Sequence, residues 1–384
     1  MSKLKQQYTG FEQGPIRPPS EASSLLIRVT RNCPWNHCAF CPVYKGTKFS
    51  LRPVDHIIRD IDQIKLHIQR IKSICAGAEN EMSAIQTLWN QSPPDQAESL
   101  HAAINWFSNG IRSVFIQDAN SLIIKPAHLV QILSHLRECF PEIQRITSYA
   151  RSHTIARISQ NDLKAICDAG LNRIHIGLES GSDAVLKIMK KGVTKKDHIN
   201  AGIKVKDAGM ELSEYVMPGL GGQALTKEHA LETADALNQI NPDFIRLRSL
   251  AIPSNIPLFE MAQKELFVSC TDEAIAHEIH LMISNLKGIQ SFIASDHILN
   301  LFEDIHGKLP NDQDKMLSII NNFFNLSPLD RTLFQVGRRL GIFRFLSQLE
   351  QPSLREQVQK ICTQMNITPD NVDQNIQKVI QRFI

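Results

Sequence analysis

The sequence lacks features that would direct the chain to a membrane or to nucleic acid. No run of about 18 apolar residues occurs in its 384 residues, so we expect no membrane-spanning helix. The first residues, MSKLKQQYTGFEQG, contain no apolar core of the kind found in a secretory signal. The formal net charge is only +3, which argues against nucleic acid or an anionic membrane surface as a partner. We therefore expect a cytoplasmic protein.

Internal repeats and low-complexity tracts are also absent, and short β-branched runs alternate instead with longer helical patterns. The expected strands are Ser24–Thr30, Ser113–Ala119, Arg145–Ala150, Arg173–Ser180, Glu211–Gly219 and Phe244–Leu250. Helices are expected over Pro53–Lys72, up to Trp106 after a poorly patterned insertion around Gln91–Asp95, and over Pro126–Phe140, Asn161–Ala169, Asp183–Ala208, Thr226–Ile240 and Thr271–Leu286. Boundary signals support these helices, with N-caps predicted at Thr226 and Thr271 and C′ glycines at Gly170 and Gly209.

Six strands, each followed by a helix, indicate an α/β fold with parallel strands and right-handed crossovers. Alternation in RIHIGLES places Ile174, Ile176 and Leu178 on one face. Arg173, His175, Gly177 and Glu179 lie on the other face, and FIRLRSL repeats the pattern with Arg246 and Arg248. An open sheet covered by helices on both sides should be apolar on both faces. We therefore predict a partial (β/α)6 TIM-like barrel with a polar interior, the alternative being charges that pair with one another inside a dry barrel.

After about residue 290 the strand signals stop. Helix starts are predicted at Ser327, at Ser353 in a capping box with Glu356, and at Thr368. The expected organisation is a lead segment over residues 1–20, the partial barrel over 21–290 and a small helical region over 291–384.

The chain has eight cysteines, and five of them stand alone, where burial as small apolar residues is expected: Cys75, Cys139, Cys167, Cys270 and Cys362. The other three, Cys33, Cys38 and Cys41, fall together in RNCPWNHCAFCP, directly after the first strand. A closed structural zinc site needs four ligands, and the adjacent His37 is poorly placed to share an ion with Cys38. Three thiolates suit a 4Fe–4S cluster with one open iron, which is of use to a reactive site.

This loop resembles the signature of the radical S-adenosylmethionine (SAM) enzymes, C-x3-C-x-aromatic-C. Cys38, Ala39, Phe40 and Cys41 match its last half, whereas the first interval is one residue longer, giving C-x4-C-x2-C. The sequence is similar to the branch described as oxygen-independent coproporphyrinogen oxidase-like. That likeness covers roughly Phe11 to Leu340 and includes QDANSLI, ITSYAR, HIGLESGSD, LSEYVMPGLGG, IRLRSL and SDHILN.

The resemblance implies a 4Fe–4S cluster on Cys33, Cys38 and Cys41, with SAM bound at the open iron. It further implies reductive cleavage of SAM to a 5′-deoxyadenosyl radical that acts on a small-molecule substrate. An electron donor such as flavodoxin or ferredoxin would supply the electron. The reaction after radical formation, whether of an oxidoreductase, lyase or transferase, stays open.

The resemblance also implies roles for residues near the other strands. Phe40 would pack near the adenine, Trp35 would shield the cluster, and Glu179 would lie near the ribose. The family often has Gly-Gly-Glu after the second strand, where this chain has Gln117, Asp118, Ala119 and Asn120, so Asp118 or Asn120 would accept from the methionine ammonium. Gly219, Gly221 and Gly222 would let backbone approach the adenine, and Arg246 and Arg248 would bind the methionine carboxylate or an acidic substrate. Further interior candidates are Arg28, Ser148, Tyr149, Arg151 and His175, whereas Asp296 and His297 are expected to have surface or capping roles.

Two readings without catalysis stay open. In one, the cysteine trio is a structural zinc or cluster site with a fourth protein ligand. In the other, the chain is a haem- or cofactor-binding chaperone built on the same barrel.

Overall fold

The computed structural model describes residues 7–380, which divide into two compact units interleaved along the chain. The first unit comprises residues up to 36, 46–175 and 204–211, and the second comprises 37–45, 176–203 and 212 onward. Residues 1–6 of the predicted lead segment and 381–384 of the predicted helical region lie outside the described residues. The predicted domain boundaries at residues 20 and 290 stay predictions.

The first unit contains three parallel strands, paired in the order β1 (Leu25–Arg28), β4 (Ser113–Gln117) and β5 (Arg145–Ala150). All five residues of β4 are buried, as expected of a central parallel strand with both faces covered. The short strands β2 (Thr30–Arg31) and β3 (Ser50–Leu51) pair antiparallel beyond the end of β1. In the sequence, β2 precedes and β3 follows the segment that contains the three clustered cysteines.

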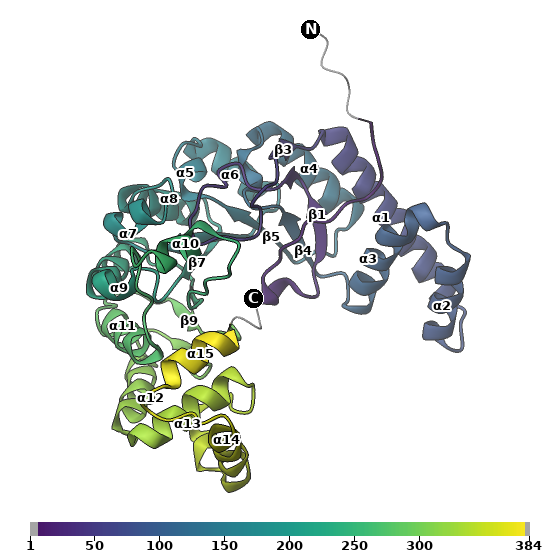
Figure 1. Ribbon diagram of the computed structural model, residues 1–384. Helices are drawn as coiled ribbons and strands as arrows, with labels where there is room; N and C mark the ends of the chain where they lie inside the picture. Colours follow the sequence, from purple (N-terminus) through teal and green to yellow (C-terminus); the bar gives the residue numbers. More distant parts are fainter. Residues whose placement is uncertain (1–6, 381–384) are drawn as a thin grey trace. The chain divides into compact units, whose positions relative to one another are not determined.

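The helices of the first unit are α1 (Val54–Cys75), α2 (Glu81–Gln91), α3 (Ala97–Ser108), α4 (Pro126–Cys139), α5 (Ser152–Ile155) and α6 (Gln160–Asp168), with 3-10 turns at Pro19–Glu21, Pro94–Gln96 and Ser121–Ile123. In α1, Ile57, Ile61, Ile64 and Ile68 recur at three- and four-residue spacing and are all buried. Figure 1 shows α2 standing away from β1 and β4, and its one buried residue is Ile85.

The second unit continues the parallel arrangement. Strand β6 (Arg173–Glu179) enters it at Ile176, and β7 (Glu211–Val216), β8 (Phe244–Leu247) and β9 (Phe292–Ala294) pair in parallel order. Strand β10 (His306–Lys308) closes this edge antiparallel to β9.

The helices of the second unit are α7 (Asp183–Ile188), α8 (Lys195–Asp207, which passes into the first unit at Lys204), α9 (Gly222–Ile240), α10 (Pro257–Gln263), α11 (Asp272–Ser284), α12 (Gln313–Asn325), α13 (Pro328–Arg339), α14 (Pro352–Gln364) and α15 (Val372–Ile380), with a 3-10 turn at Leu346–Glu350. Buried phenylalanines hold the C-terminal helices together. The rings of Phe302 and Phe323 meet edge-on at 5.3 Å, and Phe334 stacks on Phe343 at 6.3 Å.

These elements confirm the predicted fold class, an α/β chain of parallel strands and helices in partial-barrel order followed by a helical C-terminal region. All six predicted strands are present, and the apolar face of β6, Ile174, Ile176 and Leu178, is fully buried. No helix within residues 7–380 is both long and apolar enough to cross a membrane, as the composition predicted.

Helix α2 was not predicted, and it lies just before the insertion expected around Gln91–Asp95. Two secondary-structure predictions are wrong. The single helix expected over Asp183–Ala208 is two helices. The break between α7 and α8 lies where Lys190 and Gly192 adopt positive φ values of 51° and 69°. Strands also continue past residue 290, because β9 and β10 extend the sheet of the second unit.

The predicted helix ends are partly confirmed. Thr271 and Ser327 cap α11 and α13 through their hydroxyls, and Gly170 and Gly209 follow helices with positive φ. The N-cap predicted at Thr226 is wrong, since α9 begins at Gly222 and the Thr226 hydroxyl donates instead to Glu278 at 2.6 Å. The starts predicted at Ser353 and Thr368 are also displaced, because α14 begins at Pro352 and α15 at Val372.

Candidate functional site

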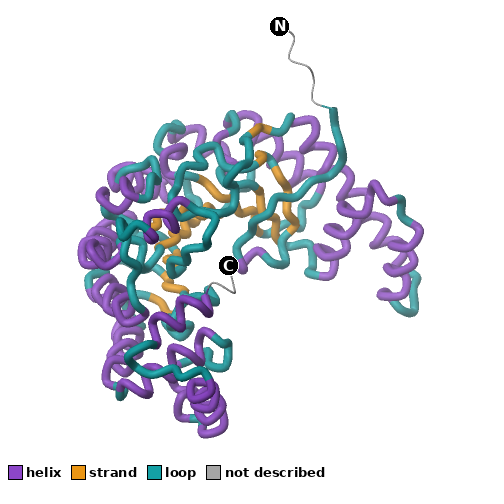
Figure 2. The backbone as a smooth tube through the Cα atoms, in the orientation of Figure 1, coloured by secondary structure: helices purple, strands orange, loops and turns teal. Residues whose placement is uncertain are grey.

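The clustered cysteines lie in an irregular segment after β2, drawn as loop in Figure 2. Cys33 belongs to the first unit, and Cys38 and Cys41 belong to the second. All three are half-buried and none is in a disulfide. In the first unit the backbone N–H of Asn36 donates to Cys33 Sγ at 3.4 Å, a contact that stabilises negative charge on the sulfur.

Hydrogen bonds to the backbone of Cys38 and Ala39 hold the second part of the loop. The N–H of Ala39 donates to the carbonyl of Met189 at 2.9 Å, and the carbonyl of Ala39 accepts from Leu258 at 3.0 Å. The Lys45 ammonium donates to the carbonyl of Cys38 at 2.8 Å. Because Ala39 lies between Cys38 and Cys41, these contacts fix the backbone from which both thiols project.

This donor set fits an iron–sulfur cluster. Half-buried cysteines outside disulfides, on a short hydrogen-bonded loop, are the ligands that such clusters use, and N–H groups directed at sulfur tune them. The assignment of Cys33, Cys38 and Cys41 as the three ligands stays a prediction.

Asp118, predicted to bind an ammonium, is fully buried at the end of β4 and contacts groups of its own unit. Its carboxylate accepts from the Arg28 guanidinium at 2.9 Å and from the backbone N–H of Asn32 at 3.1 Å. Asn32 precedes Cys33 and has a φ of 66°, a left-handed conformation that asparagine tolerates. Asp118 therefore orients the entry to the cysteine loop.

Glu12 extends this network from the N-terminal segment. Its carboxylate lies 2.6 Å from both Arg31 and Arg52 and 3.5 Å from Arg28. Burial opposes its ionisation, but the hydrogen bond from Arg31 and the three guanidinium charges outweigh burial and hold the pKa of Glu12 below its usual value. Sequence reasoning missed Glu12, since no local pattern marks a carboxylate whose partners lie 16 to 40 residues away.

Asn120, the other candidate after β4, is also fully buried and bonded within the first unit. Its amide group donates to the Thr154 hydroxyl at 2.9 Å, and its carbonyl oxygen accepts from the N–H of Arg151 at 3.0 Å. The Arg151 guanidinium in turn lies over the Trp35 ring, 5.0 Å from the centroid. Asn120 thus ties the end of β4 to the residues after β5.

The second unit brings together three side chains from distant parts of the sequence. Lys191, which sequence reasoning missed, donates to the Glu179 carboxylate at 3.0 Å and lies 5.6 Å from the centre of the Phe40 ring. Glu179 ends β6 with a φ of 63°, and its backbone carbonyl accepts from Met217 at 3.0 Å. Lys191 therefore contacts both Glu179, the residue predicted to lie near the ribose, and Phe40, the residue predicted to pack near the adenine.

Glu214 on β7 is a second carboxyl beside Glu179 that the sequence did not single out. The residue is fully buried, and burial followed by the charge of Glu179 raises its pKa well above 4.5, although Lys191 opposes this. The raised pKa favours the protonated form of the Glu214 carboxyl, and a protonated carboxyl can donate a hydrogen bond.

The glycines after β7 are required by local packing. Gly219 has a φ of 85°, and Gly222, at 59°, has no room for a side chain because a Cβ there would lie 2.8 Å from the carbonyl oxygen of Val268. Gly221 stands immediately before α9. The predicted contact of these glycines with an adenine stays a prediction.

The two arginines on β8 and just after it have different surroundings. Arg246 forms an ion pair with Asp296 at 2.8 Å, so Asp296 has a pairing role in addition to its place on the surface. Arg248 lies over the Tyr215 ring at 4.7 Å. Burial, and then the positive charge of Arg248, lower the pKa of the neighbouring His297 to about 4 despite the opposing charge of Asp296, so His297 is neutral at pH 7.

Comparison with known proteins identifies the class to which this fold and this cysteine loop belong. The profile of the Radical SAM superfamily matches residues 27–237, more than half of the chain. The chain therefore belongs to the radical SAM superfamily, as the loop predicted. Members of this superfamily bind a 4Fe–4S cluster and SAM, which confirms both predicted cofactors.

Individual relatives are distant. A tRNA uridine(34) acetyltransferase of Methanocaldococcus jannaschii is 23% identical over 269 residues, covering 64% of this chain and 46% of that protein. The heme chaperone HemW of Bacillus subtilis is 21% identical over 190 residues, covering 48% of this chain and 49% of that protein. The structure of coproporphyrinogen III oxidase (HemN) from Escherichia coli has 15% identity and a TM-score of 0.46, covering 68% of this chain and 52% of that one. The chain spans between 26% and 51% of the length of the curated relatives it matches.

Proposed function

We propose that this chain is a radical SAM enzyme whose Cys33, Cys38 and Cys41 bind the cluster and which acts on a small-molecule substrate. The observation that carries the proposal is the cysteine loop, with three thiols outside any disulfide on a backbone bonded at Asn36 and Ala39. When bound and reduced, the cluster supplies one electron that cleaves the S–C5′ bond of SAM to methionine and a 5′-deoxyadenosyl radical.

The residues of this chain would bind and orient the cofactor. Glu179, oriented by Lys191, would accept hydrogen bonds from the ribose hydroxyls, and Glu214 beside it, whose pKa burial raises, would donate one when protonated. Phe40 would pack against the adenine. Of the two arginines, Arg248 is the better partner for a carboxylate of SAM or substrate, because Arg246 already pairs with Asp296.

Asp118 and Asn120 would contribute by positioning rather than by direct contact with an ammonium. Both are fully buried, and their carboxylate and amide groups bond to Arg28, Asn32, Thr154 and Arg151. An electron donor of the flavodoxin or ferredoxin class would deliver the electron in the cytoplasm.

A second candidate function is haem binding without catalysis, which similarity to the heme chaperones HemW of Buchnera aphidicola and Bacillus subtilis supports. A tRNA substrate is a third possibility, since several relatives carry names of tRNA-modifying enzymes. The formal charge of only +3 favours a small molecule over tRNA.

The test is anaerobic reconstitution of the full chain with iron and sulfide, followed by dithionite and SAM, with 5′-deoxyadenosine as the readout. We expect a brown protein that forms 5′-deoxyadenosine, and loss of both iron and product in Cys33→Ala, Cys38→Ala and Cys41→Ala. Cys75→Ala, which changes a half-buried cysteine at the end of α1, is the matched control and should retain both.

Parallel samples distinguish the alternatives. If the fully loaded protein forms no 5′-deoxyadenosine but binds haem stoichiometrically, haem binding replaces catalysis as the function of this chain. If bulk tRNA stimulates product formation, tRNA replaces a small molecule as the proposed substrate. Full iron retention in any of the three loop variants would disprove the ligand assignment.

A further inference from the structure

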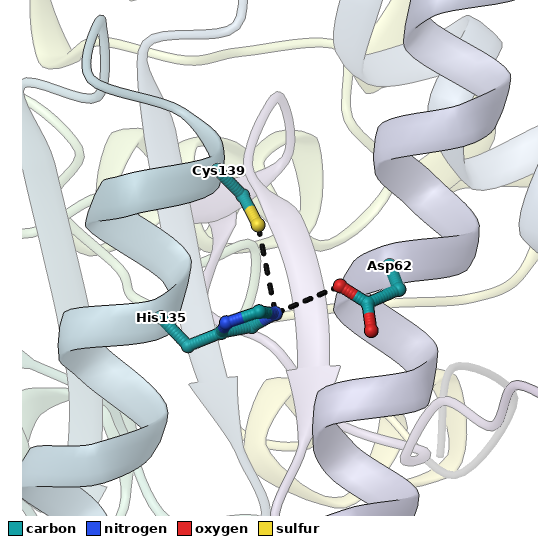
Figure 3. A group of neighbouring side chains, drawn as sticks. All are labelled: Asp62, His135 and Cys139. Carbon is teal, nitrogen blue, oxygen red and sulfur yellow. Dashed lines mark hydrogen bonds and ion pairs between the residues drawn. The ribbon is translucent and has the colours of Figure 1, made fainter.

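A second group of metal-binding side chains lies in the first unit, away from the cysteine loop in sequence. Asp62 projects from α1, and His135 and Cys139 project from α4, one helical turn apart (Figure 3). His135 Nε2 lies 2.8 Å from Asp62 Oδ1 and 3.5 Å from Cys139 Sγ. All three ligand atoms lie within 4.8 Å of one another.

The arrangement follows from helix geometry. Residues four apart on a helix share a face, so His135 and Cys139 both point toward the same turn of the neighbouring α1. Cys139 is one of the cysteines for which simple burial was expected. That expectation is confirmed for Cys270 and Cys362, but Cys75, Cys139 and Cys167 are half-buried.

The contacts converge on a single atom. Carboxylate oxygen and sulfur both approach Nε2 of His135, and one ring nitrogen carries either a proton or a lone pair, so it cannot satisfy both neighbours fully. A catalytic Cys-His-Asp relay would instead place the thiol and the carboxylate at opposite ring nitrogens. Oxygen, nitrogen and sulfur atoms that lie within 4.8 Å of one another are close enough to share one metal ion.

We propose that Asp62, His135 and Cys139 bind a Zn²⁺ ion that joins α1 to α4, with water as the fourth ligand. Oxygen, imidazole nitrogen and thiolate sulfur are the three donor types that zinc uses in proteins. The ion would take the place of the shared proton and spread the three atoms slightly to reach tetrahedral geometry.

The surroundings are compatible with a divalent cation. Asp62, Glu138 and a deprotonated Cys139 supply negative charge, which Lys65 on α1 partly offsets. Burial raises the pKa of the free Cys139 thiol, so without a metal it is a poor nucleophile. Asp62 is half-exposed, which leaves an entry path for the ion.

The experiment uses the full-length chain with Cys33, Cys38 and Cys41 all changed to serine, so that the cluster loop cannot bind the metal. Zn²⁺ is titrated and its stoichiometry measured after gel filtration, and Co²⁺ serves as a spectroscopic probe through its thiolate charge-transfer absorption. We expect one ion per chain, with the thiolate absorption present.

Adding Cys139→Ser should remove the thiolate absorption. Either Cys139→Ser or His135→Gln should weaken Zn²⁺ binding by at least about tenfold, because loss even of outer-shell partners costs metal sites about 10- to 100-fold. Cys167→Ser and His128→Gln, which change a half-buried cysteine on α6 and an exposed histidine on α4, are the matched controls. Far-ultraviolet circular dichroism checks that each variant is folded.

Absence of bound Zn²⁺ in the triple-serine chain, or equal affinity in Cys139→Ser and Cys167→Ser, would overturn the proposal. Since this chain carries no cluster ligands, either result is independent of whether the protein cleaves SAM.

Discussion

The carboxylate of Asp118 lies 3.1 Å from the backbone nitrogen of Asn32, the residue before Cys33. The same oxygen, Oδ2, also accepts from the Arg28 guanidinium at 2.9 Å. One buried oxygen thus joins the end of β4, the end of β1 and the start of the cysteine loop. Since the N–H and guanidinium donors converge on a charged acceptor, this contact is stronger than a neutral hydrogen bond.

Replacing Asp118 by asparagine tests this relationship. Asp118→Asn keeps the shape but removes the charge that Arg28 and Asn32 share, and we expect a loss of about 1.5–3 kcal/mol of unfolding free energy. Urea denaturation measures the loss, and iron retention after reconstitution should fall with it. Asp95→Asn, at an exposed position, should change stability by less than about 0.5 kcal/mol. Equal stability of the two variants would contradict the structural role of Asp118.

Lys191 is expected to control the affinity for SAM. In Lys191→Gln, Glu179 loses its cationic partner while the buried Glu214 remains beside it. Loss of a charge-assisted hydrogen bond worth about 1.5–3 kcal/mol should weaken SAM binding at least about tenfold. Equilibrium dialysis with the reconstituted protein measures this. Lys187→Gln on the exposed side of α7 is the control, and unchanged affinity in Lys191→Gln would exclude the predicted role of Glu179.

Glu214 predicts a pH dependence of stability. Its pKa in the folded chain lies well above 4.5, so as pH rises past 4.5 the unfolded chain releases its proton first. The wild type therefore loses stability from this group between pH 4.5 and the folded-state pKa. Glu214→Gln cannot ionise, and its stability relative to the wild type should increase as pH rises. Parallel pH-stability curves from denaturant titrations would disprove the elevated pKa.

Gly222 predicts a steric effect on the turn before α9. An alanine Cβ at this position would approach the Val268 carbonyl oxygen to 2.8 Å in a backbone with a φ of 59°. We expect Gly222→Ala to cost about 1–3 kcal/mol of stability. Gly77→Ala is the matched control, since nothing lies within 4 Å of a Cβ there. A thermal melt in which both variants match the wild type would show that the turn can relax.

The sequence predicted the parts of the site whose ligands are neighbours in the chain. Cys33, Cys38 and Cys41 fall within nine residues, so their spacing indicated a cluster loop, and the resemblance of that loop to a known signature indicated the superfamily. Lys191 was missed because its partner Phe40 lies about 150 residues away and MKKG resembles any helix end. Thr226 was misassigned for a related reason, since a capping hydroxyl and one that donates to Glu278 look identical in sequence.

The sequence by itself determined the α/β alternation and the cysteine loop, because strand and helix periods and ligand spacing are properties of residues close together in the chain. Tertiary structure alone decided that Asp118 accepts hydrogen bonds from Arg28 and Asn32, that burial beside Glu179 raises the pKa of Glu214, and that Asp62 lies close to His135 and Cys139. Those outcomes depend on burial and on charges brought together by packing, and neither is encoded in local spacing.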